Sequence, residues 1–131
     1  MEVKINQSFR DLTVYKKAFN LAMQIFELSK KFPVEERYSL TDQIRRSSRS
    51  VCGCIAEAYR KRQYESYFVS KTSDSDMENS ETQVWLNFSY KCKYLEMETY
   101  QDLLNKSEEI GKMLNHMIQN PEKYRRSKDK E

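Results

Sequence analysis

The sequence predicts an all-α protein folded as an antiparallel, up-and-down four-helix bundle. Its 131 residues include two glycines and two prolines, whereas a β-sandwich or β-barrel needs a turn roughly every ten residues. Small and apolar residues recur at spacings of three and four in four successive segments, as they do in amphipathic helices. The connectors between these segments are short, which favours antiparallel neighbours.

The first helix is expected over residues 13–31, with Thr13 as its cap and Pro33 just beyond its end. Its core-facing residues are expected to be Tyr15, Ala18, Ala22, Ile25, Ser29 and Phe32. Phe19, Met23 and Phe26 form a second apolar strip on another side of the same helix. A bundle helix needs one buried face, so the second strip indicates a further contact surface.

The second helix is expected over residues 41–62 and carries six arginines and lysines. Its core-facing residues keep the same spacing and are Leu40, Ile44, Ser47, Val51, Ile55 and Ala58. This segment therefore combines a buried face with a dense group of cations.

The third helix is expected over residues 65–95, although SKTSDSDMENS in its middle is rich in residues that prefer turns. The spacing nevertheless predicts one long helix whose inner face consists of Phe68, Thr72, Ser75, Asn79, Thr82, Leu86 and Ser89. The buried hydroxyl groups on this face need hydrogen-bond partners, often a carbonyl one turn back.

The fourth helix is expected over residues 100–119, with Thr99 as its cap and Pro121 after its end. Its inner face is predicted to contain Leu103, Ser107, Ile110, Leu114 and Met117. The bundle then spans residues 1–120. Residues 121–131 form a charged, flexible tail that cannot bury enough apolar surface to order itself.

Charge and hydropathy limit the classes of function. Charged residues make up 33% of the chain, but the formal net charge is only +3, which argues against an obligate polyanion-binding protein. No apolar run of about 18 residues is present for a membrane span. The first residues, MEVKINQSFRDL, lack the apolar centre of a signal peptide. We therefore expect a cytoplasmic protein that has no membrane partner.

Catalytic and metal-binding patterns are not evident in the sequence. His116 is the single histidine and falls off the inner face of its helix. Cys52 and Cys54 are two residues apart on a helix and point to nearly opposite sides, so we expect them to be small buried residues with free thiols. We predict no enzyme, no metal site and no cofactor.

Three motifs resemble a known family: residues 9–51, the octapeptide IAEAYRKR at 55–62 and MENSETQVWL at 77–86. They are similar to the four-helix-bundle proteins encoded in intervening sequences of bacterial large-subunit ribosomal RNA genes. The most specific stretch is FPVEERYSLTDQIRR. The resemblance implies a four-helix bundle assembled as a cyclic homopentamer with no known enzymatic activity. It also implies a relation to the accessory variability proteins of diversity-generating retroelements, which are thought to engage a reverse transcriptase and nucleic acid.

Arg45 and Arg49 lie one turn apart on the second helix and are candidates for ion pairs. In an antiparallel hairpin of the second and third helices, they lie level with residues 83 and 79. We therefore expect them to pair with Glu78 and Glu81, inside the bundle or across a subunit boundary, because buried charges need partners.

A second group of cations is a candidate nucleic-acid interface. It comprises Arg60, Lys61, Arg62, Arg125 and Arg126. Arginine suits phosphate recognition, and each neutralised phosphate releases counterions, which makes binding salt-dependent. The alternative is plain solvation, since cations are favoured at the C-terminal end of a helix dipole.

Aromatic residues flank this cationic group, namely Tyr59, Tyr64, Tyr67 and Phe68. They either stack on exposed bases or pack within the bundle.

Two functions are consistent with these patterns. The first is a non-enzymatic, oligomeric bundle that binds RNA or DNA through the end of the second helix and the basic tail. The second is a structural or adaptor protein in which arginines form ion pairs and the surface binds another protein, such as a reverse transcriptase.

Overall fold

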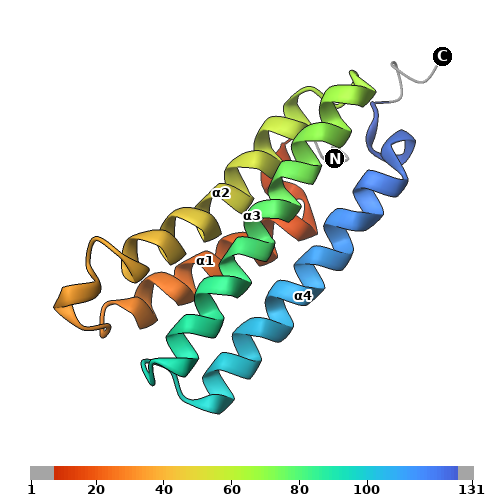
Figure 1. Cartoon of the computed structure of the whole chain (residues 1–131). Coiled ribbons are helices and arrows are strands. Elements are labelled where there is room, and N and C mark those ends of the chain that lie inside the picture. The colour runs from red at the N-terminus through yellow and green to blue at the C-terminus, as the bar shows by residue number, and fades with distance from the viewer. Residues whose placement is uncertain (1–7, 127–131) are drawn as a thin grey trace, which may run out of the picture.

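Four α-helices run antiparallel in the computed structural model, which describes residues 8–126 (Figure 1). They are α1 (Thr13–Ser29), α2 (Leu40–Arg60), α3 (Glu65–Lys91) and α4 (Met97–Gln119). Each helix packs against the next along the chain, and α4 returns beside α1 to close the bundle. The predicted all-α, up-and-down four-helix bundle is confirmed.

The inner faces predicted for α2, α3 and α4 are buried at every predicted position. On α1 the buried residues also include Val14 and Leu21, whereas Tyr15 is only half-buried. The second strip on α1 is exposed, since Phe19 and Met23 are 48% and 44% accessible. One side of each helix therefore forms the core, and α1 keeps apolar side chains outside it.

The inner face of α3 carries hydroxyl groups that bond back to their own helix. Thr72 Oγ1 donates to the carbonyl of Phe68 at 2.7 Å, and Ser89 Oγ donates to the carbonyl of Trp85 at 2.8 Å. Both partners lie one turn back, as expected for buried hydroxyls in helices. Within the polar SKTSDSDMENS stretch, the bond of Thr72 satisfies one buried hydroxyl group inside the helix itself.

Other polar groups of α3 reach α2. Ser75 Oγ donates to the carbonyl of Val51 at 2.9 Å, and Thr82 Oγ1 donates to Ser47 Oγ at 2.8 Å. A buried polar group without a partner is costly. Sliding α3 along α2 would break both contacts, so they favour one register between the helices.

A third set of buried bonds joins α3 to α4. Asn79 Nδ2 donates to the carbonyl of Ser107 and Ser107 Oγ donates to Asn79 Oδ1, both at 2.9 Å, while Gln83 Nε2 donates to Ser107 Oγ at 3.0 Å. A Cβ atom added to Gly111 would lie 3.3 Å from Asn79 Nδ2. Glycine thus leaves room for the Asn79 amide beside α4.

Three helices end earlier than the sequence predicts. α3 ends at Lys91, four residues early, because the N–H groups of Tyr94 and Leu95 donate to the carbonyl of Ser89. Lys93 takes a positive φ of 69° in this turn, as often happens just beyond a helix C-terminus. α1 and α2 end at Ser29 and Arg60, each two residues before the predicted position.

The predicted caps are also wrong. Leu12 occupies the cap position of α1 and Glu96 that of α4, and neither makes a side-chain capping bond. Thr13 and Thr99 are already helical.

The prediction that the chain beyond Pro121 cannot order itself is wrong for residues 121–124. Pro121–Tyr124 forms a short 3₁₀ helix. The Tyr124 ring stacks on Phe68 with centroids 5.7 Å apart, and its hydroxyl lies 3.1 Å from His116 Nδ1. One aromatic side chain in the charged segment provides this anchor. Residues 127–131 lie outside the described chain.

All three cysteines are free, but they differ in burial. Cys52 is buried, as predicted, and its burial raises the pKa of its thiol to about 11. Cys54 is half-buried, and burial also raises its pKa. Cys92 lies exposed just after α3. The prediction of small buried thiols therefore holds fully for Cys52 and only in part for Cys54.

We expect Asn79→Ala to lower the free energy of unfolding by about 2 kcal/mol, because the Ser107 hydroxyl loses its buried acceptor and the carbonyl of Ser107 loses a donor. Urea denaturation followed by circular dichroism measures this change. Asn115→Ala, an exposed change on α4, is the control and should shift stability by less than about 0.5 kcal/mol. Equal effects of the two substitutions would contradict a stabilising role for the Asn79 contacts.

We expect Cys92 to react with a chromogenic disulfide reagent at pH 8 while Cys52 stays protected until the protein unfolds. Replacing Cys92 with serine should remove the fast phase.

The pKa of the Cys52 thiol is raised to about 11 from an ordinary 9.0, and this affects how stability depends on pH. Between these pH values the unfolded chain loses the thiol proton first, so Cys52 makes stability fall as pH rises through this window. Rapid labelling of Cys52 in the folded protein would contradict the buried position.

Candidate nucleic-acid interface

Three segments with cationic side chains meet at one end of the bundle (Figure 1). They are the 3₁₀ turn Phe9–Asp11 before α1, the α2–α3 turn at residues 61–64, and residues 121–126 after α4. The first turn packs against α2, and the last turn packs against α3 and α4. Residues 8–11, 60–67 and 121–126 together hold seven arginines and lysines and three acidic residues, so this end, here called the basic end, carries positive charge.

The α2–α3 turn presents two of the predicted cations to solvent. Arg60 is the last residue of α2 and Lys61 follows it, and both are exposed. Lys61 Nζ lies 5.1 Å from the centre of the Tyr67 ring. These two side chains have the accessibility that contact with phosphate requires.

Arg62 does not fit the predicted role. It is 8% accessible, its guanidinium carbon lies 3.9 Å from the centre of the Tyr59 ring, and Nη1 donates to the carbonyl of Tyr59 at 2.8 Å. The guanidinium therefore satisfies the C-terminal end of α2. The prediction that Arg62 belongs to an exposed group of cations is therefore wrong.

Arg125 and Arg126 follow the 3₁₀ turn Pro121–Tyr124 and are half-buried. The stacking of Tyr124 on Phe68, near the start of α3, brings this segment to the same end as Arg60 and Lys61. Both arginines make contacts of their own within the fold.

Arg10 and Lys123 join the basic end but were not predicted from the sequence. Both side chains are exposed. The residues Asp11–Val14 line a cavity of about 280 Å³ together with Tyr124, which brings the start of the described chain beside its end. No local sequence pattern signals this arrangement, because Arg10 is distant in sequence from the other cations.

The aromatic residues near the α2–α3 turn divide into two pairs. Tyr59 and Phe68 are buried, at 6% and 0% accessibility, and serve as packing groups. Tyr64 and Tyr67 are exposed, at 59% and 38%. Tyr64 is the residue before α3 and stands next to the exposed cations.

Arg45 lies against α1. Its Nε donates to Ser29 Oγ at 2.8 Å, its Nη2 donates to the carbonyl of Phe26 at 3.4 Å, and its guanidinium carbon is 4.7 Å from the centre of the Phe26 ring. The guanidinium carbon of Arg49 lies 5.6 Å from the same ring. The predicted pairing of these arginines with α3 inside the bundle is therefore not what the structure shows, because both turn to the α1 side of α2.

Glu78 and Glu81 lie on the outer part of α3. Partial burial, followed by the negative charges of Glu81 and Asp74, raises the pKa of Glu78, and Arg46 opposes this shift. Glu81 Oε1 accepts a hydrogen bond from Trp85 Nε1 at 3.3 Å. Arg46, rather than Arg45 or Arg49, is thus the arginine of α2 that acts on Glu78. Pairing of Arg45 and Arg49 with these acids across a subunit boundary stays a prediction.

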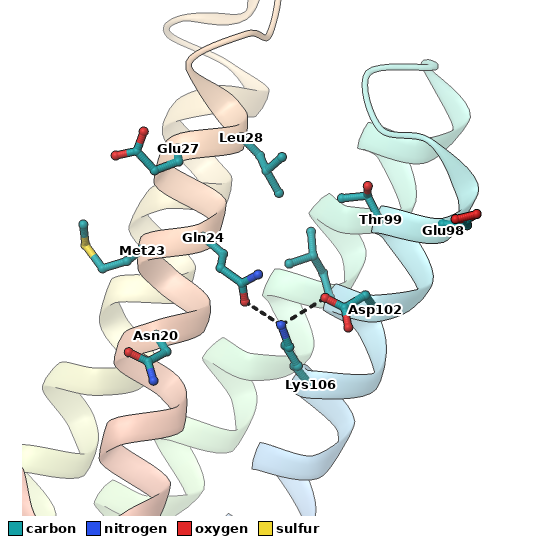
Figure 2. A pocket seen from close by; sticks show the side chains of 10 residues that line it. Asn20, Met23, Gln24, Glu27, Leu28, Glu98, Thr99, Asp102 and Lys106 are labelled. Carbon is teal, nitrogen blue, oxygen red and sulfur yellow. Dashed lines mark hydrogen bonds and ion pairs between the residues drawn. The ribbon is translucent and has the colours of Figure 1, made fainter.

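A groove of about 840 Å³ lies between α1 and α4 (Figure 2). Its lining includes the acids Glu27, Glu98 and Asp102. Lys106 is the one cation among the lining residues, and its Nζ already pairs with Asp102 at 3.0 Å and donates to Gln24 Oε1 at 2.9 Å. The negative charge of this groove disfavours phosphate groups.

Across residues 8–126, no three His, Cys, Asp or Glu side chains gather as a metal site would require. None of the helices in this part of the chain combines the length and the apolar character needed to cross a bilayer.

The sequence and the fold of this chain are similar to those of known proteins. Residues 10–116 match the model of the 23S rRNA-intervening sequence protein family. A crystal structure of a protein of unknown function from the S23 ribosomal protein family of Bacteroides thetaiotaomicron is 31% identical, with a TM-score of 0.74, and the match covers 81% of this chain and 95% of the other. Among curated proteins, none is similar enough to count as a relative.

The matched region runs from the 3₁₀ turn before α1 to near the end of α4 and includes all three sequence motifs of the predicted resemblance. The relation to retroelement accessory proteins stays a prediction. The four-helix fold and the match over most of its length together show that this chain belongs to the 23S rRNA-intervening sequence protein family.

Proposed function

We propose that this protein is a non-enzymatic accessory protein that binds nucleic acid through its basic end, with little sequence preference. The observation that carries the proposal is the meeting of cations from three separate segments at one end of the bundle. Arg10, Arg60, Lys61 and Lys123 supply exposed charges there. Phosphate groups are recognised mainly by such charges, and backbone contacts of this kind carry no sequence information.

Exposed aromatic side chains support contact with single-stranded nucleic acid at the same place. Tyr64 and Tyr67 are accessible beside Lys61. Bases of single strands stack on aromatic side chains, and cations beside them hold the phosphates. RNA with an unpaired loop or end is therefore the ligand that this surface suits best.

The charge distribution elsewhere favours this end over other surfaces. The groove between α1 and α4 is acidic, and Arg45 is occupied by contacts with α1. Arg62 is also occupied by its own turn. The proposed interface therefore uses fewer cations than the sequence predicted, and its affinity should be modest.

The alternative function, an adaptor that binds a protein such as a reverse transcriptase, stays a prediction. The two functions differ in their dependence on salt. Phosphate binding weakens steeply as salt is added, because counterions are released on binding, whereas a packed protein interface is screened much less.

We expect the protein to bind labelled RNA and duplex DNA at about 50 mM salt, with an affinity that falls as salt rises. Replacing Arg60 and Lys61 with alanine should lower the slope of log affinity against log salt by about two, one for each lost phosphate contact. Fluorescence anisotropy across a salt series measures both quantities. Arg62 is left unchanged because its loss would damage the turn.

The matched control for this double variant removes Lys31 and Arg37, which are exposed near the opposite end of the bundle. It changes the net charge by the same amount. If both double variants lose affinity equally, overall charge rather than the basic end is responsible. Absence of binding by the parent protein at low salt would refute the proposed function.

We expect Tyr64→Ala to weaken binding of single-stranded RNA by about 1 kcal/mol, or roughly fivefold, because one base loses its stacking partner. Binding of duplex DNA should change little, since its bases are already stacked. Tyr38→Ala is the control, because Tyr38 is 87% exposed in the connector between α1 and α2. A similar loss with both nucleic acids would contradict base stacking on Tyr64.

A further inference from the structure

Another cavity, of about 380 Å³, lies at the end of the bundle opposite the basic end (Figure 1). It forms where the connector between α1 and α2 meets the last turns of α3. Its lining includes Glu36, Tyr38, Gln43, Trp85, Phe88 and Cys92. Pockets of a few hundred Å³ with apolar walls and a few polar groups are typical of ligand sites. This space is called the aromatic cavity below.

Three aromatic rings line the aromatic cavity and are open to solvent to different degrees. Tyr38 and Phe88 are 87% and 54% exposed, and Trp85 is half-buried. The Trp85 indole is held by the hydrogen bond that its Nε1 donates to Glu81 Oε1. The Trp85 and Phe88 ring centroids are 5.9 Å apart, with 35° between the planes. The faces of such rings attract cations, and arginine stacks on them more often than lysine does.

Glu36 places a carboxylate beside these rings. Its Oε1 accepts a hydrogen bond from the backbone N–H of Leu40 at 3.2 Å, and its Oε2 accepts one from the Tyr94 hydroxyl at 2.8 Å. The hydrogen bond to Glu36, followed by burial, raises the pKa of Tyr94 to about 12. Across the described residues, Glu36 forms no ion pair. Each carboxylate oxygen can accept a further bond, so a fixed carboxylate without a paired cation lies at this cavity.

The cavity lining contains no lysine or arginine within the part of the chain that the structure describes. Arg37 follows Glu36 in sequence and is exposed, and its guanidinium carbon lies 5.9 Å from the centre of the Tyr38 ring. The fold also places arginine beside other rings, as the contact of Arg62 with Tyr59 shows. A guanidinium group is therefore compatible with the rings of this protein, and the aromatic cavity leaves room for one more.

We propose that the aromatic cavity binds the guanidinium group of an arginine on a partner protein. The planar group stacks on the rings and donates charge-assisted hydrogen bonds to Glu36, and Gln43 offers an amide oxygen as a second acceptor. A lysine ammonium is compact and strongly hydrated, so it gains less from the rings. Val84, 45% exposed on α3, adds an apolar surface nearby that a protein covers and a small molecule does not.

Trp85 is the single tryptophan of the chain, so its fluorescence reports binding in the purified full protein. N-acetyl-arginine amide, titrated at constant ionic strength, should cause a saturable change with a dissociation constant of about 1 mM. N-acetyl-citrulline amide has nearly the same shape without the charge and should bind at least about tenfold more weakly. N-acetyl-lysine amide carries the same charge as the arginine probe and should also bind more weakly.

Glu36→Gln should weaken binding of the arginine probe at least about tenfold, because the charge is lost while the side chain keeps its size. Glu35→Gln is the matched control. Glu35 is the adjacent, exposed residue, and it is not part of the lining. The control changes the net charge by the same amount and should alter affinity less than about twofold. If circular dichroism shows that Glu36→Gln loses helicity, Phe88→Ala replaces it and should weaken binding about threefold.

Cys92 gives a second readout that does not depend on fluorescence. It is exposed and lines the cavity, so the arginine probe should slow its alkylation by iodoacetamide, and the citrulline probe should not. A leucine-flanked arginine tripeptide should bind at least about threefold more tightly than the blocked amino acid, because it also covers apolar surface. Equal affinities would assign the cavity to a free guanidinium compound and overturn the protein partner.

Three results would overturn binding of arginine altogether. They are the absence of a saturable change up to about 20 mM probe, equal affinities for the arginine and citrulline or lysine probes, and equal effects of Glu36→Gln and Glu35→Gln. Dissociation of an oligomer by the arginine probe, seen by light scattering, would place the arginine on a second copy and overturn a separate partner. The aromatic cavity and the basic end are at opposite ends of the bundle, so the proposal does not depend on nucleic-acid binding.

Discussion

The polar inner face of α3 is the constraint on which the rest of the structure depends. Thr82 bonds to Ser47 of α2, and Asn79 exchanges two hydrogen bonds with Ser107 of α4. Apolar packing is tolerant of small shifts in register, whereas buried hydrogen bonds are not, because each shift leaves unsatisfied groups. The central helix of the chain is thereby held against both neighbours, and the faces that it turns outward are determined at the same time.

That constraint explains the unusual distribution of apolar residues on α3. Small polar residues occupy much of its inner face, and the larger Met77, Val84 and Phe88 lie outside. Exposed apolar side chains therefore lie on the outer side of α3, away from its largely polar inner face.

The basic end results from chain geometry rather than from a single motif. An up-and-down bundle of four helices places its first residues, its central turn and its last residues at the same end. Cations that are far apart in sequence meet there, and the stacking of Tyr124 on Phe68 holds the last segment in place.

The sequence by itself determined the fold class and the inner faces of α2, α3 and α4, because helical periodicity survives in a single chain even where propensity is poor. It also indicated that α1 carries a second apolar strip. Only the tertiary structure decided which cations are free. The guanidinium of Arg62 packs on the Tyr59 ring, and that of Arg45 bonds to α1. A long side chain contacts the carbonyl groups and rings that the packing of the helices places near it. The end of α3 at Lys91 was decided by local backbone bonds to the carbonyl of Ser89, and the docking of Tyr124 by its contact with Phe68. Helical periodicity encodes neither of these.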